Sequence, residues 1–190
     1  NCVTVGDGGR LTGYNTDLGG ARHLLESVRP EPRSVLLLGA GGAARAVAAA
    51  LEDLGLPAPV AATRSPETAA AFTRLFPSAR VIPWYRLTEG AFGAGFELVV
   101  NCTPVGMSPA GEQTPLTGHL QPGQTVMDLI YSPRPTRLLR EARAAGAAVR
   151  DGLPMLAVQA ALSLAIWLDL PEAPVDRLMG IAEDLLPAAW

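Results

Sequence analysis

Short apolar runs alternate with amphipathic stretches along most of the chain. Six of these runs have the length of buried strands and lie near residues 34–38, 59–63, 80–83, 97–101, 125–130 and 147–150. Most are separated by segments of helical period, such as 67–75 and 135–145. Strands that alternate with helices predict an α/β fold with a doubly wound, mostly parallel Rossmann-type sheet. We expect the strand order 3-2-1-4-5-6, numbered from the run at 34–38.

Both ends of the chain depart from this alternation. Residues 1–14 have the pattern of a β-hairpin, and a helix over 16–28 follows, with Thr16 as its expected N-cap. The last forty residues predict two helices, over 153–168 and 174–186. The first of these is apolar but shorter than the ~20 residues that span a bilayer, so we expect a buried helix and no membrane partner.

The turn after the first parallel strand carries the strongest motif, Gly39-Ala-Gly-Gly-Ala-Ala44. In this G-x-G-x-x-A pattern, Gly39 permits a tight turn, Gly41 lets the backbone approach a pyrophosphate, and Ala44 lets helix and strand pack closely. The free N–H groups and the positive end of the helix dipole would then face the phosphates. The pattern predicts dinucleotide binding, and the alternative is a tight βα turn without a ligand. The expected cofactor contacts are Gly39, Ala40, Gly41, Gly42 and Ala43.

The end of the second parallel strand narrows the choice of cofactor. An NAD site usually has an acidic residue there, which accepts hydrogen bonds from the ribose. This strand ends instead in Thr63, Arg64 and Ser65. A guanidinium suits a 2′-phosphate, and a hydrogen bond to such a charged group contributes about 1.5–3 kcal/mol. The sequence therefore favours NADP, although Arg64 could also be an ordinary solvated side chain.

Two further polar turns follow the fourth and fifth parallel strands, at 101–107 and 128–133. Each could simply end its strand. In a parallel sheet, however, the carboxyl ends of the strands share one edge, where ligands bind. We therefore expect a nicotinamide site formed with these turns. Its expected members are Asn101, Thr103, Pro104, Val105, Met107 and Tyr131.

Composition and charge restrict the partners. The 190 residues carry a formal net charge of −3, whereas nucleic-acid binding favours a basic protein, so we expect no nucleic-acid partner. Cys2 and Cys102 lack metal-ligand spacing, so we expect free buried thiols, no metal site and a reducing cytoplasm. The chain contains no lysine, which excludes a lysine general base within these residues. His23 and His119 are isolated and receive no catalytic role.

Five motifs in order along the chain resemble those of the shikimate dehydrogenase family. They are Asn15-Thr-Asp-Leu-Gly19, Gly39-Ala-Gly-Gly-Ala-Ala-Arg45, Asn101-Cys-Thr-Pro-Val-Gly-Met107, Asp128-Leu-Ile-Tyr-Ser-Pro133 and Gly152-Leu-Pro-Met-Leu-Ala-Val-Gln-Ala-Ala161. The resemblance covers nearly the whole chain. It implies a cytoplasmic oxidoreductase of aromatic amino acid biosynthesis, monomeric or homodimeric, that oxidises shikimate to 3-dehydroshikimate with NADP.

The family places a substrate domain before the nucleotide domain. The resemblance therefore implies three parts: a remnant of the substrate domain with its connecting helix at 1–28, the NADP-binding domain at 29–152, and helices at 153–190 that pack back toward the substrate domain. The family's catalytic lysine lies upstream of the position that matches Asn1. Because the chain lacks lysine and an initiator methionine, we expect a fragment that is inactive alone.

The resemblance also assigns substrate-side roles. Asp17 matches the aspartate that works with the missing lysine, although a carboxylate in the first turn of a helix is also ordinary dipole chemistry. Asn1, Tyr131 and Gln159 match substrate-side residues, whereas the pattern alone would equally place Gln159 on a wet helix face. Further expected cofactor contacts are Leu129, Gly152 and Met155.

One departure from the family concerns the cofactor. Many NADP-dependent relatives read Asn-Arg-Thr-x-x-Arg at the end of the second strand, where this chain has Thr63, Arg64, Ser65 and then Thr68. The first Asn and the second Arg are absent, so the size of the NADP preference is open. The alternatives are an NAD-using quinate/shikimate dehydrogenase and a nucleotide-binding module without chemistry of its own.

Overall fold

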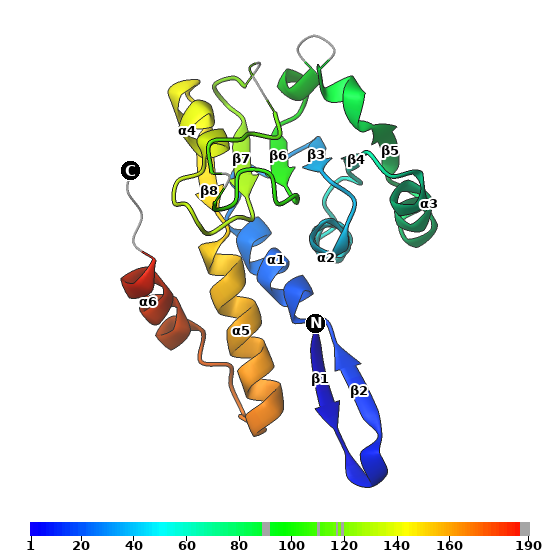
Figure 1. The fold of residues 1–190 in the computed structure, drawn as a ribbon, viewed down its shortest axis with the longest axis vertical. Coiled ribbons are helices and arrows are strands. Elements are labelled where there is room, and N and C mark those ends of the chain that lie inside the picture. Colours follow the sequence, from blue (N-terminus) through cyan, green and yellow to red (C-terminus); the bar gives the residue numbers. More distant parts are fainter. Residues whose placement is uncertain (89–91, 110, 117, 119, 187–190) are drawn as a thin grey trace.

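The computed structural model describes residues 1–88, 92–109, 111–116, 118 and 120–186 (Figure 1). Its centre is a six-stranded sheet of order β5-β4-β3-β6-β7-β8, in which every neighbouring pair is parallel. The strands are β3 (Val35–Leu38), β4 (Val60–Thr63), β5 (Arg80–Pro83), β6 (Leu98–Asn101), β7 (Thr125–Asp128) and β8 (Ala148–Asp151). In order along the chain these are the six predicted strands, and their arrangement confirms the expected doubly wound topology.

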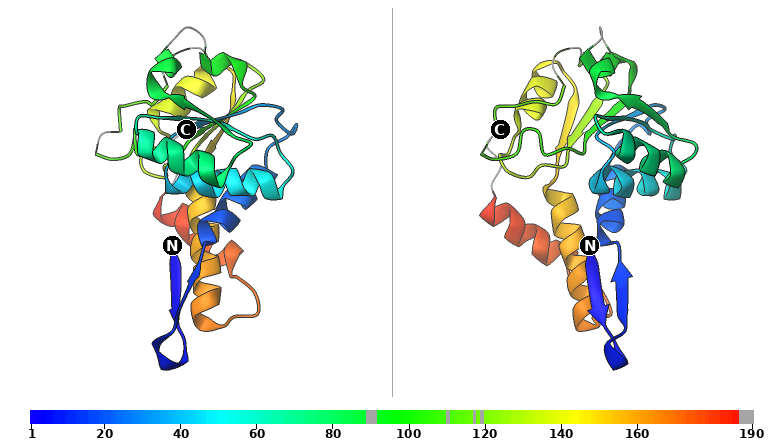
Figure 2. Two further views of the ribbon diagram at one scale, coloured as in Figure 1. Left: turned by 90° about the vertical axis from the view of Figure 1, so that its right-hand side faces the viewer. Right: turned by 45° about the vertical axis from the view of Figure 1, so that its right-hand side comes forward.

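Helices cover both faces of this sheet. The helices are α1 (Thr16–Glu26), α2 (Gly42–Asp53), α3 (Pro66–Leu75), α4 (Arg137–Ala144), α5 (Leu153–Leu168) and α6 (Val175–Leu185). Helix α6 is the exception, because it packs against α5. Successive strand residues point to opposite faces. Val35 and Leu37 join a core with α1, α2 and α3, whereas Leu36 and Leu38 join a core with α4. Figure 2 shows α2–α3 and α4 on opposite sides of the sheet.

Helices α1 and α5 meet at two glycines of α1. A Cβ on Gly20 would lie 2.6 Å from the backbone oxygen of Met155, and one on Gly19 would lie 2.4 Å from Leu162 Cδ1. Both distances are far below van der Waals contact, but the Leu162 side chain can shift, so glycine is required at Gly20, where the clash would be with the backbone. The two helices therefore pack almost backbone to backbone, which fixes the position of α5 relative to the start of α1.

A two-stranded antiparallel hairpin precedes α1, as predicted. Strands β1 (Cys2–Val5) and β2 (Leu11–Tyr14) pair with Cys2 opposite Tyr14, and a short 3-10 turn (Asp7–Gly9) joins them. The hairpin extends away from the six-stranded sheet and lies beside the C-terminal end of α5 (Figure 2). There the indole N–H of Trp167 donates to the backbone oxygen of Val3 at 3.2 Å.

Several local predictions need correction. Thr16 is the first helical residue of α1 and not its N-cap, which is Asn15. Strand β7 ends at Asp128, not at 130, because Ile130 N–H turns back to the Asp128 carboxylate. Helix α5 is only partly buried, since Trp167 and Leu168 are each 59% exposed. The 3-10 segments Trp84–Thr88 and Phe92–Gly95 were not predicted. No helix in the described part of the chain is long and apolar enough to cross a membrane.

Candidate functional site

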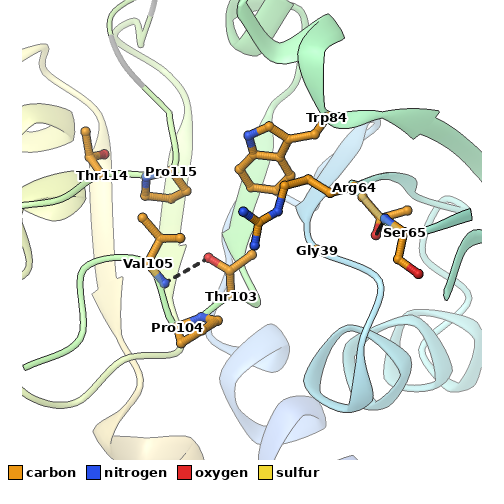
Figure 3. A pocket seen from close by; sticks show the side chains of 10 residues that line it. Gly39, Arg64, Ser65, Trp84, Thr103, Pro104, Val105, Thr114 and Pro115 are labelled. Carbon is orange, nitrogen blue, oxygen red and sulfur yellow. Dashed lines mark hydrogen bonds between the residues drawn. The ribbon is translucent and has the colours of Figure 1, made fainter. Parts of the chain in front are cut away.

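A cavity of about 440 Å³ opens at the carboxyl ends of the strands (Figure 3). It lies over the point where the chain order reverses between β3 and β6, which is where ligands bind in open α/β sheets. Its lining residues are Gly39, Thr63, Arg64, Ser65, Trp84, Thr103, Pro104, Val105, Thr114 and Pro115. Three separately predicted segments, the glycine turn, the end of the second strand and the turn at 101–107, thus contribute to a single cavity.

Gly39 brings two of these segments together. Its φ of 109° is a conformation that other residues rarely adopt. A Cβ here would lie 3.0 Å from Thr103 Cγ2 and 3.3 Å from the backbone oxygen of Cys102. The N–H of Gly39 meanwhile donates to the backbone oxygen of Ala62 at 2.8 Å. The glycine turn is therefore held between β4 and the loop that follows β6.

The start of α2 has the features of a phosphate cradle. Gly41 occupies the N-cap position, and no side chain caps the helix. A Cβ on Gly41 or Gly42 would meet nothing within 4 Å, so the backbone is open on this side. Uncapped N–H groups at a helix start bind anions. The residues present thus fit a dinucleotide pyrophosphate, by the geometry of this turn.

Arg64 is the cationic residue of the described cavity lining. It follows the last residue of β4, and its guanidinium points into the cavity (Figure 3). Ser65 lies beside it as the N-cap of α3, where its Oγ accepts from Thr68 N–H at 3.1 Å. This hydroxyl also donates to Glu67 Oε2 at 2.7 Å. The Arg64 end of the cavity therefore contains one cation and, next to it, one carboxylate.

A buried hydrogen-bond network supports the loop after β6. The Asn101 amide nitrogen donates to Asp128 Oδ1 at 2.9 Å and to the Val105 backbone oxygen at 3.2 Å. The Asn101 amide oxygen accepts from the Thr103 hydroxyl at 2.7 Å and from its N–H at 3.0 Å. Thr136 donates its hydroxyl to Asp128 Oδ2 at 2.7 Å. Thr103, which lines the cavity, is thus tied to a carboxylate in the core.

Asp128 is fully buried within this network. Burial raises the pKa of its carboxyl group to about 6, although hydrogen bonds from Thr136, Ile130 and Asn101 oppose the rise. Both oxygens of the carboxyl group already accept hydrogen bonds, and the residue does not line the cavity. Asp128 therefore acts by orienting Asn101, and through it Thr103, rather than by touching a ligand.

The two cysteines carry free thiols. Cys2 is buried, whereas Cys102 is only half-buried as a residue, which differs from the expectation. Burial of its sulfur raises the pKa of the Cys102 thiol, with a further contribution from the charge of Asp128. A thiol held in its neutral form is a poor nucleophile. Among the described residues, no group of His, Cys, Asp and Glu side chains could hold a metal ion.

A second polar cluster joins three residues predicted on the substrate side. The Asn1 amide nitrogen donates to Asp17 Oδ1 at 2.8 Å, to Thr16 Oγ1 at 2.9 Å and to Gln159 Oε1 at 3.4 Å. The Asn1 amide oxygen accepts the Thr16 N–H at 2.9 Å, and so satisfies a free donor at the start of α1. The structure therefore places Asn1, Asp17 and Gln159 in contact, although 158 positions separate the first and last of them.

A hydroxyl pair beneath this cluster fixes its geometry. Thr16 Oγ1 and Ser163 Oγ lie 2.9 Å apart, and Ser163 donates to the Gln159 backbone oxygen at 2.8 Å. Because the single Ser163 proton is used there, Thr16 donates to Ser163 and its oxygen accepts from Asn1. No sequence pattern indicated a role for Ser163, which with Gln159 is one of two polar residues on the otherwise apolar α5.

The remaining predicted residues lie away from the cavity lining. Asn101 is buried beneath it, Met155 packs into the core beside α1, and Gly152 lies against the Leu129 backbone. Tyr131 and Met107 are exposed by 39% and 45%. The others outside the lining are Ala40, Gly41, Gly42 and Ala43 at the glycine turn, and Leu129 after β7. All of them remain predictions as cofactor or substrate contacts.

Three lining residues were not predicted: Trp84, Thr114 and Pro115. Trp84 directly follows β5, so the rule applied to the other strand ends would have found it. Thr114 and Pro115 belong to the long connection between β6 and β7. No local pattern indicates that this segment folds back over the cavity.

The sheet order and the cavity define a dinucleotide-binding domain of the Rossmann type. No protein-family model matches the chain, but a shikimate dehydrogenase (NADP(+)) of Desulforamulus reducens is 40% identical over 187 residues, which cover 93% of this chain and 64% of that protein. The chain belongs to the shikimate dehydrogenase family, as the motifs indicated. It spans about two thirds of the length of the curated relatives, or slightly less.

Solved structures agree with this assignment. The shikimate 5-dehydrogenase of Thermus thermophilus in complex with NADP(H) and shikimate is 37% identical, with a TM-score of 0.78 over 94% of this chain and 65% of that chain. The quinate dehydrogenase of Corynebacterium glutamicum in complex with NAD is 30% identical, with a TM-score of 0.81 over 94% and 65%. The same fold thus occurs in complexes with either cofactor.

Proposed function

We propose that the protein interconverts shikimate and 3-dehydroshikimate with NADP(H), and that these 190 residues supply the cofactor site and one side of the substrate site. The observation that carries the proposal is the cavity in which Arg64 points over the glycine turn. The likeness to NADP-dependent relatives supports it. We further propose a cytoplasmic, monomeric or homodimeric enzyme without a nucleic-acid or membrane partner.

The cavity residues would hold the cofactor. The uncapped start of α2, with Gly41 and Gly42, would bind the pyrophosphate, and Arg64 would bind the 2′-phosphate. When bound, the nicotinamide accepts or supplies the hydride, which no side chain can do. Asn101 fixes Thr103 and Val105 at the opposite side of the cavity. These residues therefore orient the cofactor without taking part in bond changes.

The Asn1 cluster would hold the substrate. Asp17 is half-buried in the first turn of α1, where a negative side chain interacts favourably with the helix dipole. As a carboxylate it can accept a hydrogen bond from the substrate hydroxyl, and Asn1 and Gln159 can exchange their mutual bond for bonds to other hydroxyls. Helix α5 connects this cluster to the sheet edge, since Gly152 packs on Leu129 there and Gln159 reaches Asn1.

Removing the Arg64 guanidinium tests the cofactor assignment. In Arg64→Ala, the dissociation constant for NADPH should rise roughly ten- to a hundredfold, because a charge-assisted hydrogen bond is lost. The constant for NADH should stay within about twofold, since NADH lacks the 2′-phosphate. Isothermal titration calorimetry measures both. The exposed Arg74→Ala on α3 is the matched control for loss of one positive charge.

The same titrations separate the alternatives. An NAD-using quinate/shikimate dehydrogenase would bind NADH at least as tightly as NADPH before any substitution. A nucleotide-binding module would bind cofactor but remain inactive in the presence of the rest of the protein. The 190 residues alone are expected to bind NADPH without oxidising shikimate, because they contain no lysine to pair with Asp17.

A further inference from the structure

The first turn of α3 borders the Arg64 end of the cavity, and two of its positions offer no free N–H. Pro66 has no N–H. The N–H of Thr68 bonds to Ser65 Oγ at 3.1 Å. The free N–H groups at a helix start are otherwise well placed to bind an anion. Neither Pro66 nor Thr68 therefore offers a free N–H to a phosphate beside Arg64.

Glu67 itself is the anion that this turn holds. Its Oε2 accepts the Ser65 hydroxyl at 2.7 Å. That hydroxyl bond is the main cause that lowers the pKa of Glu67 below its usual value. The residue is exposed, so its carboxylate is negatively charged at neutral pH. A full negative charge therefore lies one hydrogen bond away from a residue that lines the cavity.

We propose that Glu67 is an internal competitor of the cofactor's 2′-phosphate and limits the preference of this chain for NADP over NAD. This inference rests on the proposed cofactor site. Arg64 attracts the phosphate, whereas Glu67 repels it and retains the Ser65 proton that would otherwise be donated to it. A ribose 2′-hydroxyl is neutral and can donate a hydrogen bond to a carboxylate, so the same residue tolerates NAD.

The effect can be measured with fragments that differ only at the ribose. Adenosine 2′,5′-bisphosphate and adenosine 5′-monophosphate would be titrated into the chain and its Glu67→Gln variant by calorimetry. Gln keeps the size of the side chain and removes its charge. The variant should bind the bisphosphate roughly three- to tenfold more tightly, because a nearby like charge has been removed. Its affinity for the monophosphate should change by less than about twofold.

Matched variants make the result specific. Glu52→Gln removes the same charge from an exposed position on α2 and should leave both affinities unchanged. Glu67→Ala removes the charge and the Ser65 contact together and should change the bisphosphate affinity in the same direction as Glu67→Gln. An unchanged preference in both Glu67 variants, with normal binding by the parent chain, would overturn the inference. If the parent chain binds neither fragment nor NADPH, the proposed cofactor site itself is wrong.

Discussion

The cofactor cavity and the Asn1 cluster are built in different ways. The cavity lies at the edge of a parallel sheet, and its loops are tied to the fully buried Asp128. The cluster lies where the hairpin, α1 and α5 meet, and its bonds from Asn1 to Asp17 and Gln159 are exposed. One site is supported from within the core, and the other is supported mainly by its own polar contacts.

This difference separates binding from chemistry. The cavity is supported by residues within one sheet, so its cofactor affinity should be a property of these 190 residues. The cluster has open polar groups that can exchange partners, which suits a surface that is completed by substrate and by other groups of the protein. Perturbing the buried support should therefore cost more stability than perturbing the cluster.

The largest effect is expected at Asp128, through pH. Its pKa is about 6 in the folded chain and near 3.8 when unfolded, so the folded state retains the proton longer as pH rises. Below pH 4 the neutral carboxyl group therefore contributes roughly 3 kcal/mol to the free energy of unfolding, at about 1.36 kcal/mol for each pKa unit. This contribution is lost between about pH 4 and 6. Chemical denaturation of the parent chain and Asp128→Asn at several pH values measures this loss.

The Asn variant is the internal reference. It cannot titrate, so the difference in unfolding free energy between parent and variant should fall across this interval and become constant above about pH 7. Titration of other groups contributes to both proteins and largely cancels. A difference that stays flat from pH 4 to 7 would show that Asp128 titrates normally and that its burial carries no cost.

A smaller effect is expected at Gly39. Gly39→Ala must adopt a φ of 109° and bring its Cβ to 3.0 Å from Thr103, which should lower the free energy of unfolding by about 2 kcal/mol. Gly41→Ala is the matched substitution, because Gly41 has a φ of −79° and open space around its Cβ. It should leave stability nearly unchanged while weakening NADPH binding. Thermal unfolding and calorimetry on the two variants separate strain from cofactor contact.

The same contrast explains what the sequence could predict. The glycine turn and Arg64 depend on local rules that apply at the ends of parallel strands, and the structure places both at the cavity. Thr16 was assigned as an N-cap by an equally local rule, but its own N–H bonds to Asn1, fifteen positions earlier. The contact between Asn1 and Gln159 and the return of Thr114 over the cavity depend on tertiary packing, which no local pattern encodes.

The smallest effect is expected in the cluster, at Ser163. Ser163→Ala removes the acceptor of the Thr16 hydroxyl and should cost about 1 kcal/mol of unfolding free energy. Thr88→Ala, which removes an exposed hydroxyl bonded to the Tyr85 backbone oxygen, should cost less than about 0.5 kcal/mol. Denaturant titrations of the two variants compare these costs.

Because Thr16 orients Asn1, Ser163→Ala should also speed amide hydrogen exchange at the start of α1. A loss at Ser163 as large as that at Gly39 would mean that the cluster is supported by the core as firmly as the cavity is.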